Sequence, residues 1–433
     1  MGIKDKTRLL SAKLKLGPHY GIERLGVLFS FFVLTGALVL ATSGFAAYRA
    51  SRADLNDKAL YTPSFTTSKT KLDGRVDGVW VSSDRTSALV MMHFDPRAQI
   101  SHNAADYKAF LLGANAKLTN IPLATPGVTG SAYVFGSTGY VGVRLSATAP
   151  FASQVLNLTM RSAAELAVGS QATVSKNPGE ETGDASFRKY DQWQVFFNPG
   201  AAETKSITSL DAQRLDLAEV FYQTVVADKE AAAREALDAQ LLTMRADLAQ
   251  ITAYTGDLAT TKVDGLSLRP PAVPDLINGD KVTGKSAAES TDGHSSLMLR
   301  TTSTMPGGFN LDWRSRTVFD GYLQTLVPTD ESYVAFLAGK AQEPTHQLQI
   351  SDLKWILSDG TDLAVDTSGT SMTLRPLVTV MNNLSQAYQS YYADKQKYQD
   401  DLTLALLSLD VDLRDVATNT SVNSNPQFLV VFH

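Results

Sequence analysis

LGVLFSFFVLTGALVLATSGFAAY, residues 25–48, is the stretch that decides the architecture of this 433-residue chain. It contains no charged residue and no proline, and its centre is densely apolar. At about 1.5 Å per residue, a helix of this length reaches roughly 36 Å, enough to cross a hydrocarbon core of about 30 Å. We therefore predict a membrane-spanning helix that begins at Leu25, includes Phe31 and Leu38, and ends at Tyr48.

The segment before this helix is basic. Residues 1–24 carry six lysines and arginines against one aspartate and one glutamate. Because basic segments remain on the cytoplasmic side, residues 1–24 are predicted to be a cytoplasmic head and the rest of the chain to be extracytoplasmic. A cleaved secretory signal is the alternative, but its apolar core would be about 7–15 residues, shorter than this one.

Composition favours a bacterial envelope protein. The chain has no cysteine, which excludes disulfides, thiolate metal sites and cysteine nucleophiles, and a large cysteine-free ectodomain is ordinary in bacteria. The net charge is −5 despite the basic head, which argues against binding to nucleic acid. We predict a single-pass protein of the bacterial cell membrane that contacts the lipid bilayer through residues 25–48.

The first half of the ectodomain has the pattern of a β-sandwich. After a polar linker at 49–61, residues 62–200 contain short apolar runs separated by Gly, Pro, Ser and Thr. Runs of this length and spacing are typical of strands in a sandwich-like domain. The predicted strands are Gly78–Val81, Ala88–Phe94, Ala132–Phe135, Tyr140–Leu145, Val155–Met160 and Gln192–Phe197.

A long helix is predicted over 208–256. Thr208 and Asp211 form a capping box at its start, and the chain then has no glycine or proline until Gly256. Within it, apolar residues alternate in steps of three and four, as in a coiled-coil seam. These seam residues are Leu237, Leu241, Met244, Leu248 and Ile251.

A second long helix is predicted over 376–417, with Pro376 in its first turn. Lys395 and Asp412 interrupt its heptad seam, which is otherwise apolar or aromatic. Between the two helices, residues 262–374 are predicted to form a second β-rich domain. Its strands are expected at 296–301, 317–326, 333–337, 348–350 and 353–357.

These elements predict a mixed α+β, membrane-anchored protein. Two helices of similar length that bracket one domain favour an antiparallel coiled-coil stalk with the 262–374 domain at its distal tip. The alternative is that both helices pack across the sheets as core helices. The tail, 418–433, contains an apolar strand at 427–432, which needs a sheet to join and is expected to complete the first β domain.

One motif matches a phosphate-binding loop. Gly279–Ser286 reads GDKVTGKS and fits the pattern G-x-x-x-x-G-K-S. A proline-rich stretch precedes it and a Gly- and Ser-containing loop follows, whereas a true site lies between a buried strand and a helix. We therefore expect a surface loop. The histidines lack metalloprotease spacing and no G-x-S-x-G elbow occurs, so no catalytic residue, cofactor site or metal site is predicted.

Aromatic residues supply the candidate interaction sites. Phe309, Trp313 and Arg314 follow a Pro-Gly-Gly stretch and are predicted to form a contact loop, because Trp and Arg dominate interface energies. The seam tyrosines of the second helix, Tyr388, Tyr391 and Tyr398, are expected either in the core or in an interface between subunits. A buried role for Trp313 is an open alternative.

The function that these features favour is a non-enzymatic scaffold. It would be a stalk subunit of a bacterial envelope assembly for secretion, transfer or surface structure, with other envelope proteins and further copies of itself as partners. A membrane-tethered module that binds a surface ligand or cell-wall glycan is the alternative, and it would need Trp80, Trp193 or Trp313 in a cleft. An enzyme of unrecognised kind is a third hypothesis.

Overall fold

The computed structural model describes most of residues 57–432 in two compact units. The fold is mixed α+β, with β-sheets and two long helices. The first unit contains the described residues up to Ala132, Gly142–Asp211 and the chain from Asn423 onward, and the second contains Tyr133–Val141 and Ala212–Val422. The described residues are 57–95, 98, 100–115, 117–162, 191–301, 312–327, 330–341, 353–363 and 372–432.

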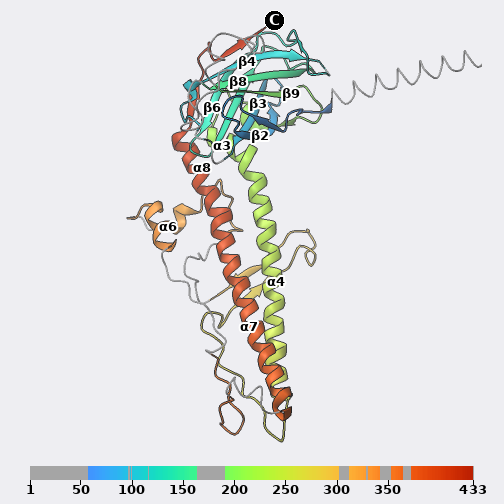
Figure 1. Ribbon diagram of the computed structural model, residues 1–433, viewed down its shortest axis with the longest axis vertical. Helices are drawn as coiled ribbons and strands as arrows, with labels where there is room; N and C mark the ends of the chain where they lie inside the picture. The colour runs from blue at the N-terminus through green and yellow to red at the C-terminus, as the bar shows by residue number, and fades with distance from the viewer. Residues whose placement is uncertain are drawn as a thin grey trace, which may run out of the picture. The chain divides into compact units, whose positions relative to one another are not determined.

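Two larger sheets and one two-stranded sheet make up the β structure of the described residues, and the two larger ones can be followed in Figure 1. In one sheet the order is β1 (Ser64–Thr66), β2 (Asp73–Val81), β3 (Ser87–Phe94), β7 (Tyr140–Ser146), β6 (Thr129–Phe135) and β13 (Ser421–Asn423), and β10 (Lys205–Ser206) pairs in parallel with β2. In the other the order is β14 (Leu429–Val431), β4 (Tyr107–Ala114), β8 (Val155–Ser162) and β9 (Gln192–Phe197), and β5 (Asn120–Ile121) pairs with β4.

An aromatic core joins the two sheets. Phe65 and Phe94 come from the first sheet, and the ring of Trp193 from the second sheet lies 5.8 Å and 5.1 Å from them. The indole Nε1 of Trp193 donates to Met92 Sδ at 3.3 Å, which gives this buried polar atom a partner. Packing of this kind between two mainly antiparallel sheets fits a sandwich-like domain.

The C-terminal strand β14 is paired in parallel with β4. Leu429 lies opposite Ala109 and Val431 opposite Leu111. β13 (Ser421–Asn423) precedes it in the chain. The last described residues thus complete a sheet whose other members come from the first half of the chain.

The first long helix begins later than the sequence predicts. Thr208–Leu210 is a single 3₁₀ turn, and the helix starts as α3 (Leu217–Phe221), with Asp216 capping the N–H groups of Ala218 and Glu219. The carboxylate of Asp211 instead accepts the Ser83 N–H and hydroxyl, both at 2.7 Å. The predicted capping box is therefore wrong, because Asp211 stabilises the β2–β3 turn.

Two long helices dominate the second unit. After α3, a π-helical turn (Tyr222–Val226) leads into α4 (Ala227–Thr260), and Gly256 lies inside α4 rather than ending it. A 3₁₀ turn (Met372–Leu374) precedes α7 (Arg375–Leu402), a second π-helical turn (Thr403–Leu407) and α8 (Ser408–Asn419). α4 has 34 residues and is thus about 51 Å long.

α4 and α7 lie side by side (Figure 1). Gln240 of α4 donates to Asp401, which lies at the end of α7, whereas Thr255, further along α4, contacts Tyr388, earlier in α7. The helices are therefore antiparallel. Their seam includes the buried residues Leu237, Leu241, Met244, Leu377, Met381, Leu384, Tyr388, Tyr391, Tyr398 and Leu402.

Residues 262–374, which we name the insert, contain less strand than the sequence predicts. In its described part, β11 (Lys281–Thr283) and β12 (Met298–Arg300) form a two-stranded ribbon, and α5 (Leu323–Leu326) and α6 (Tyr333–Ala341) are helices. The predicted strand at 333–337 is wrong because Ser332 accepts the Ala335 N–H and caps an alanine-rich helix. The predicted strand at 348–350 lies outside the described residues.

The insert lies along the helix pair, so the prediction of a distal head is wrong. Tyr391 in the middle of α7 donates to Asp280 at 2.8 Å. Further along the insert, Val318 donates to Glu230 near the start of α4, and Tyr322 donates to Asp410 in α8. These hydrogen bonds hold the insert against the sides of the helices. They do not leave it at the C-terminal end of α4 and the N-terminal end of α7, where a distal head would lie.

The predicted membrane helix lies outside the described residues. Residues 25–48, including Leu25, Phe31, Leu38 and Tyr48, belong to that undescribed part of the chain. In the residues that the structure does describe, no helix is both long and apolar enough to cross a bilayer.

Candidate functional site

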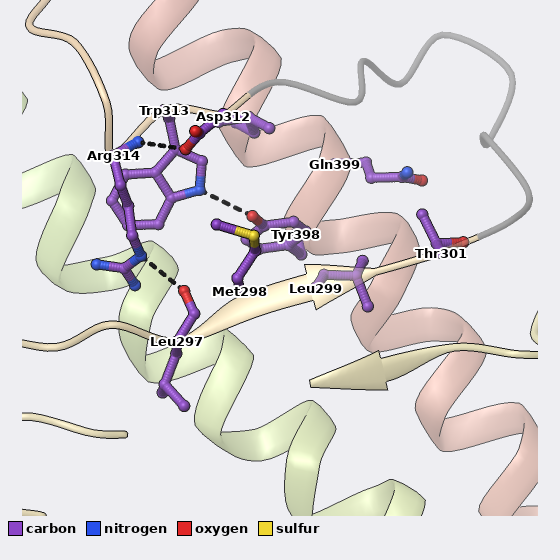
Figure 2. Close-up of a pocket in the computed structure, with 10 residues that line it drawn as sticks. Leu297, Met298, Leu299, Thr301, Asp312, Trp313, Arg314, Tyr398 and Gln399 are labelled. Carbon is purple, nitrogen blue, oxygen red and sulfur yellow. Dashed lines mark hydrogen bonds between the residues drawn. The ribbon is translucent and has the colours of Figure 1, made fainter. Parts of the chain in front are cut away.

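A small cavity lies in the second unit between β12, the segment that begins at Asp312, and α7 (Figure 2). Its volume is about 70 Å³. Figure 2 shows Trp313 and Arg314 on one side of it and Thr301 and Gln399 on the other. The lining residues are Leu297, Met298, Leu299, Thr301, Asp312, Trp313, Arg314, Tyr398, Gln399 and Leu402.

Trp313 forms one wall of this cavity. Its side chain is only 3% exposed, and its indole Nε1 donates to the hydroxyl oxygen of Tyr398 at 2.8 Å. The guanidinium of Arg314 lies 4.2 Å from the ring centroid and that of Arg234 lies 5.6 Å from it. Two cations over one ring are favourable because the face of the π-system is electron-rich.

Arg314 is held in place by several acceptors. Its Nε donates to the carbonyl oxygen of Leu297 at 2.6 Å, and Nη1 donates to the carbonyl oxygen of Ser295 at 2.9 Å. The guanidinium also forms an ion pair with Asp238 of α4. With these partners, Arg314 fastens the insert to α4 and is not a free cation for an external ligand.

Tyr398 and Gln399 supply the hydrogen-bonding groups of α7 at this cavity. Burial raises the pKa of Tyr398, so its hydroxyl stays protonated at neutral pH. Because that hydroxyl accepts from Trp313, its own proton can still be donated. Gln399 is 3% exposed, and its Oε1 has no hydrogen-bond partner among the described residues.

Glu230 is a buried carboxylate that anchors the insert to α4. It accepts the Val318 N–H at 3.0 Å and the Tyr222 hydroxyl at 3.1 Å. Arg234, one turn further along α4, donates to the same carboxylate at 2.6 Å and to the Tyr322 hydroxyl at 2.6 Å. A buried carboxylate with this many donors is fully compensated for the loss of water.

Asp410 is the matching anchor on α8. It is buried, and its Oδ2 accepts the backbone N–H groups of Tyr322 and Leu323 at 2.9 Å and 2.7 Å. Arg414 donates to Oδ1 at 3.3 Å. Glu230 and Asp410 thus hold the same short stretch of the insert from two different helices.

A third buried cluster joins α7 to an earlier part of the insert. Lys395 is fully buried, and its ammonium lies 2.8 Å from Asp280 Oδ2. It also donates to the carbonyl oxygen of Leu276 at 2.7 Å and to the Thr301 hydroxyl at 3.0 Å. Lys395, which interrupts the heptad seam in the sequence, therefore serves the insert. Asp280 also accepts the Tyr391 hydroxyl, and burial, followed by the charge of Asp280, raises the pKa of Tyr391.

The structure brings some of the predicted interaction residues together. Trp313, Arg314 and Tyr398 meet at the cavity, whereas Tyr388 and Tyr391 lie elsewhere in α7 and are buried. Trp313 therefore lies in the interior of its unit rather than in a surface contact loop. Phe309 lies outside the described residues.

Sequence reasoning missed the acidic and amide residues that hold the insert. Glu230, Asp410 and Gln399 lie outside every motif in the sequence, and Asp280 lies inside the phosphate-loop motif, which was predicted to be a surface loop. For Asp410 and Gln399, the available signal was position: both lie in or beside the apolar stripe of a long helix, where a polar residue needs a buried partner.

The phosphate-loop motif forms a turn whose N–H groups are already used. β11 lies in a two-stranded ribbon, the Lys285 N–H donates to Ser296 Oγ, and the Ser286 N–H donates to Glu289. Hydrogen bonds from Arg245 and Ser286 lower the pKa of Glu289 to about 2, so a carboxylate already occupies this turn. The expectation of a surface loop is met only at the turn, because the motif also contains strand β11 and the buried Asp280.

The tryptophans and the metal-ligating side chains were the other candidates for a site. The chain has four tryptophans, Trp80, Trp193, Trp313 and Trp355, and each is at most 8% exposed. Among the described residues, no three side chains of His, Asp or Glu gather where they could hold a metal ion. Comparison with protein-family models, with curated proteins and with solved structures finds no match to this chain.

Proposed function

We propose that this chain is a non-enzymatic scaffold subunit of a bacterial cell-envelope assembly for secretion, transfer or surface structure. Residues 25–48 anchor it in the membrane as a single pass, with residues 1–24 in the cytoplasm. The ectodomain holds other envelope proteins, and further copies of the chain, outside the membrane. The antiparallel helix pair acts as a coiled-coil stalk that keeps the bound partners at a defined spacing.

The observation that carries this proposal is how the helix pair is braced. α4 and α7 are each long enough to act as a spacer, but two helices alone leave much of their apolar surface in water. The insert covers that surface and is fixed by buried polar groups at Lys395, Glu230 and Asp410. Such a brace keeps a helix pair straight and rigid, which suits a structural role.

The alternative of a glycan-binding module has less support. Protein surfaces that bind sugars or other ligands by stacking need exposed aromatic rings. Trp80, Trp193 and Trp313, on which that alternative depends, are all buried.

The test is the native mass of the full-length protein after gentle extraction from its own membranes, with bound proteins identified. We expect a mass several times 46.7 kDa. Deletion of residues 25–48 should move the chain from the membrane fraction to the soluble fraction. A monomer of 46.7 kDa without bound proteins would refute the scaffold. Membrane association that persists without residues 25–48 would refute the anchor.

A variant can link assembly to the brace. Asp280→Asn should weaken the contact between insert and α7 and reduce the amount of co-purified protein while the chain remains in the membrane. Asp275→Asn is the matched control, because Asp275 is an exposed carboxylate of the same insert. Equal loss of partners in both variants would show that the brace is not what the assembly depends on.

A further inference from the structure

We infer that the cavity between β12 and α7 is a binding site for a small neutral molecule that carries a carboxamide or hydroxyl group on a short apolar chain. This inference is independent of the proposed scaffold function. It rests on the volume of the cavity, on the polar groups that line it and on its lack of an uncompensated charge.

The volume sets the size of the ligand. A cavity needs at least about 10–15 Å³ to hold one water molecule, so a cavity of about 70 Å³ exceeds that threshold several times and limits the ligand to a small molecule. Leu297, Leu299 and Leu402 give it apolar walls that water does not hydrate well. A ligand with an apolar end gains by displacing water from such walls.

The polar groups set the chemistry of the ligand. Gln399 Oε1 is a buried acceptor without a partner among the described residues, and a buried polar group left in that state costs free energy. Tyr398 still has a proton to donate after accepting from Trp313. A carboxamide or hydroxyl group both donates and accepts, so it has the group that each of these side chains needs.

The charges around the cavity favour a neutral ligand. Arg314 is paired with Asp238 and with two carbonyl oxygens. Asp312 is exposed, and its carboxylate accepts the backbone N–H of Arg314. Because no unpaired buried charge lines the cavity among the described residues, a charged ligand would lose its hydration without a buried counter-charge.

The experiment uses fluorine NMR of the full-length chain labelled with 5-fluorotryptophan. Four tryptophans give four resonances, and Trp313→Phe identifies the one at the cavity. Butyramide is the probe, since it is a small neutral carboxamide on a short apolar chain, and butyrate and butylammonium are the charged controls. We expect butyramide alone to shift the Trp313 resonance saturably, while the other three resonances stay in place.

Two variants test the assignment by different routes. Gln399→Leu removes the acceptor and should weaken butyramide binding by about tenfold, the loss of one hydrogen bond. Leu402→Phe fills the cavity and should abolish the shift without touching a polar group. Gln386→Leu, at an exposed position of α7, is the matched control and should bind like the unaltered chain.

Each result either supports or overturns the binding site. The site would be overturned if butyramide caused no saturable shift of the Trp313 resonance, or if both cavity variants left that shift unchanged. Binding of butyrate or butylammonium as tight as that of butyramide would overturn the neutral class of ligand. The positions of the other three tryptophan resonances report whether each variant is folded, so a misfolded Gln399→Leu leaves Leu402→Phe to decide.

Discussion

Replacing Asp280 by asparagine removes the counter-charge of a fully buried ammonium. Lys395 is 0% exposed, and its acceptors include Asp280, the Leu276 carbonyl and the Thr301 hydroxyl. Asparagine keeps the shape of the side chain and can still accept from Tyr391. The variant therefore isolates the charge.

The expected loss of stability is large. Breaking a buried ion pair by removing one partner costs about 3–5 kcal/mol, because the remaining charge is uncompensated. At roughly 1.4 kcal/mol per factor of ten, amide exchange by local opening of the insert should accelerate by about a hundredfold to several thousandfold. Asp280→Asn combined with Lys395→Met removes both charges and should recover most of that loss.

Hydrogen exchange with mass spectrometry of the full-length protein measures this effect peptide by peptide. The acceleration should appear around β11 and β12 of the insert and in the middle of α7. Asp275→Asn, at an exposed carboxylate, should change exchange by no more than the equivalent of about 0.5 kcal/mol. The reasoning is refuted if Asp280→Asn behaves like this control, or if adding Lys395→Met makes the loss larger.

Three further predictions concern the helix pair. Glu230→Gln should lower the free energy of unfolding by about 1.5–3 kcal/mol, because the residue loses its charge opposite Arg234. Urea unfolding of the second unit measures this loss, and an unfolding midpoint that does not shift beyond error would contradict the prediction. Asp410→Asn should lower the free energy of unfolding by about 1–3 kcal/mol. Its effect should not add to that of Glu230→Gln, since both residues bind the same stretch of the insert. A double-mutant cycle that shows no coupling energy would contradict this. Burial, and then the neighbouring Asp394, raise the pKa of Asp247 from 3.8 to about 6, so protonation stabilises the folded pair. This gain in the free energy of unfolding is present at low pH and is lost as pH rises through about 6. In urea unfolding between pH 4 and pH 7, Asp247→Asn should make the free energy of unfolding depend less on pH. An unchanged pH dependence would exclude Asp247 as its source.

Local sequence signals determined where strands and long helices lie. Apolar runs bounded by turn residues located the strands of the first unit, since alternation along a strand depends only on neighbouring residues. The heptad of α7 and Pro376 in its first turn located the second long helix in the same way. Both signals can be read from the sequence because residues on the buried face of a helix or strand repeat with the period of that backbone.

Tertiary contacts decided what these signals left open. Asp211 has the spacing of a helix cap, but it accepts from Ser83 in a distant turn. The terminal strand needs a sheet, but only the fold places it parallel to β4. In each case the partner in the contact is far away in sequence, and the local pattern of apolar residues carries no information about it.

The cavity shows the same division within one site. The sequence itself determined that Trp313, Arg314 and Tyr398 are large side chains of the types that contribute most to the energy of a contact. Only the tertiary structure decided that they face each other inside one unit, that Asp238 neutralises Arg314, and that Gln399 lines the cavity with an unpaired oxygen. The physical reason is that burial and pairing of a polar group depend on the elements that pack around it, and the insert brings those elements together from far apart in the chain.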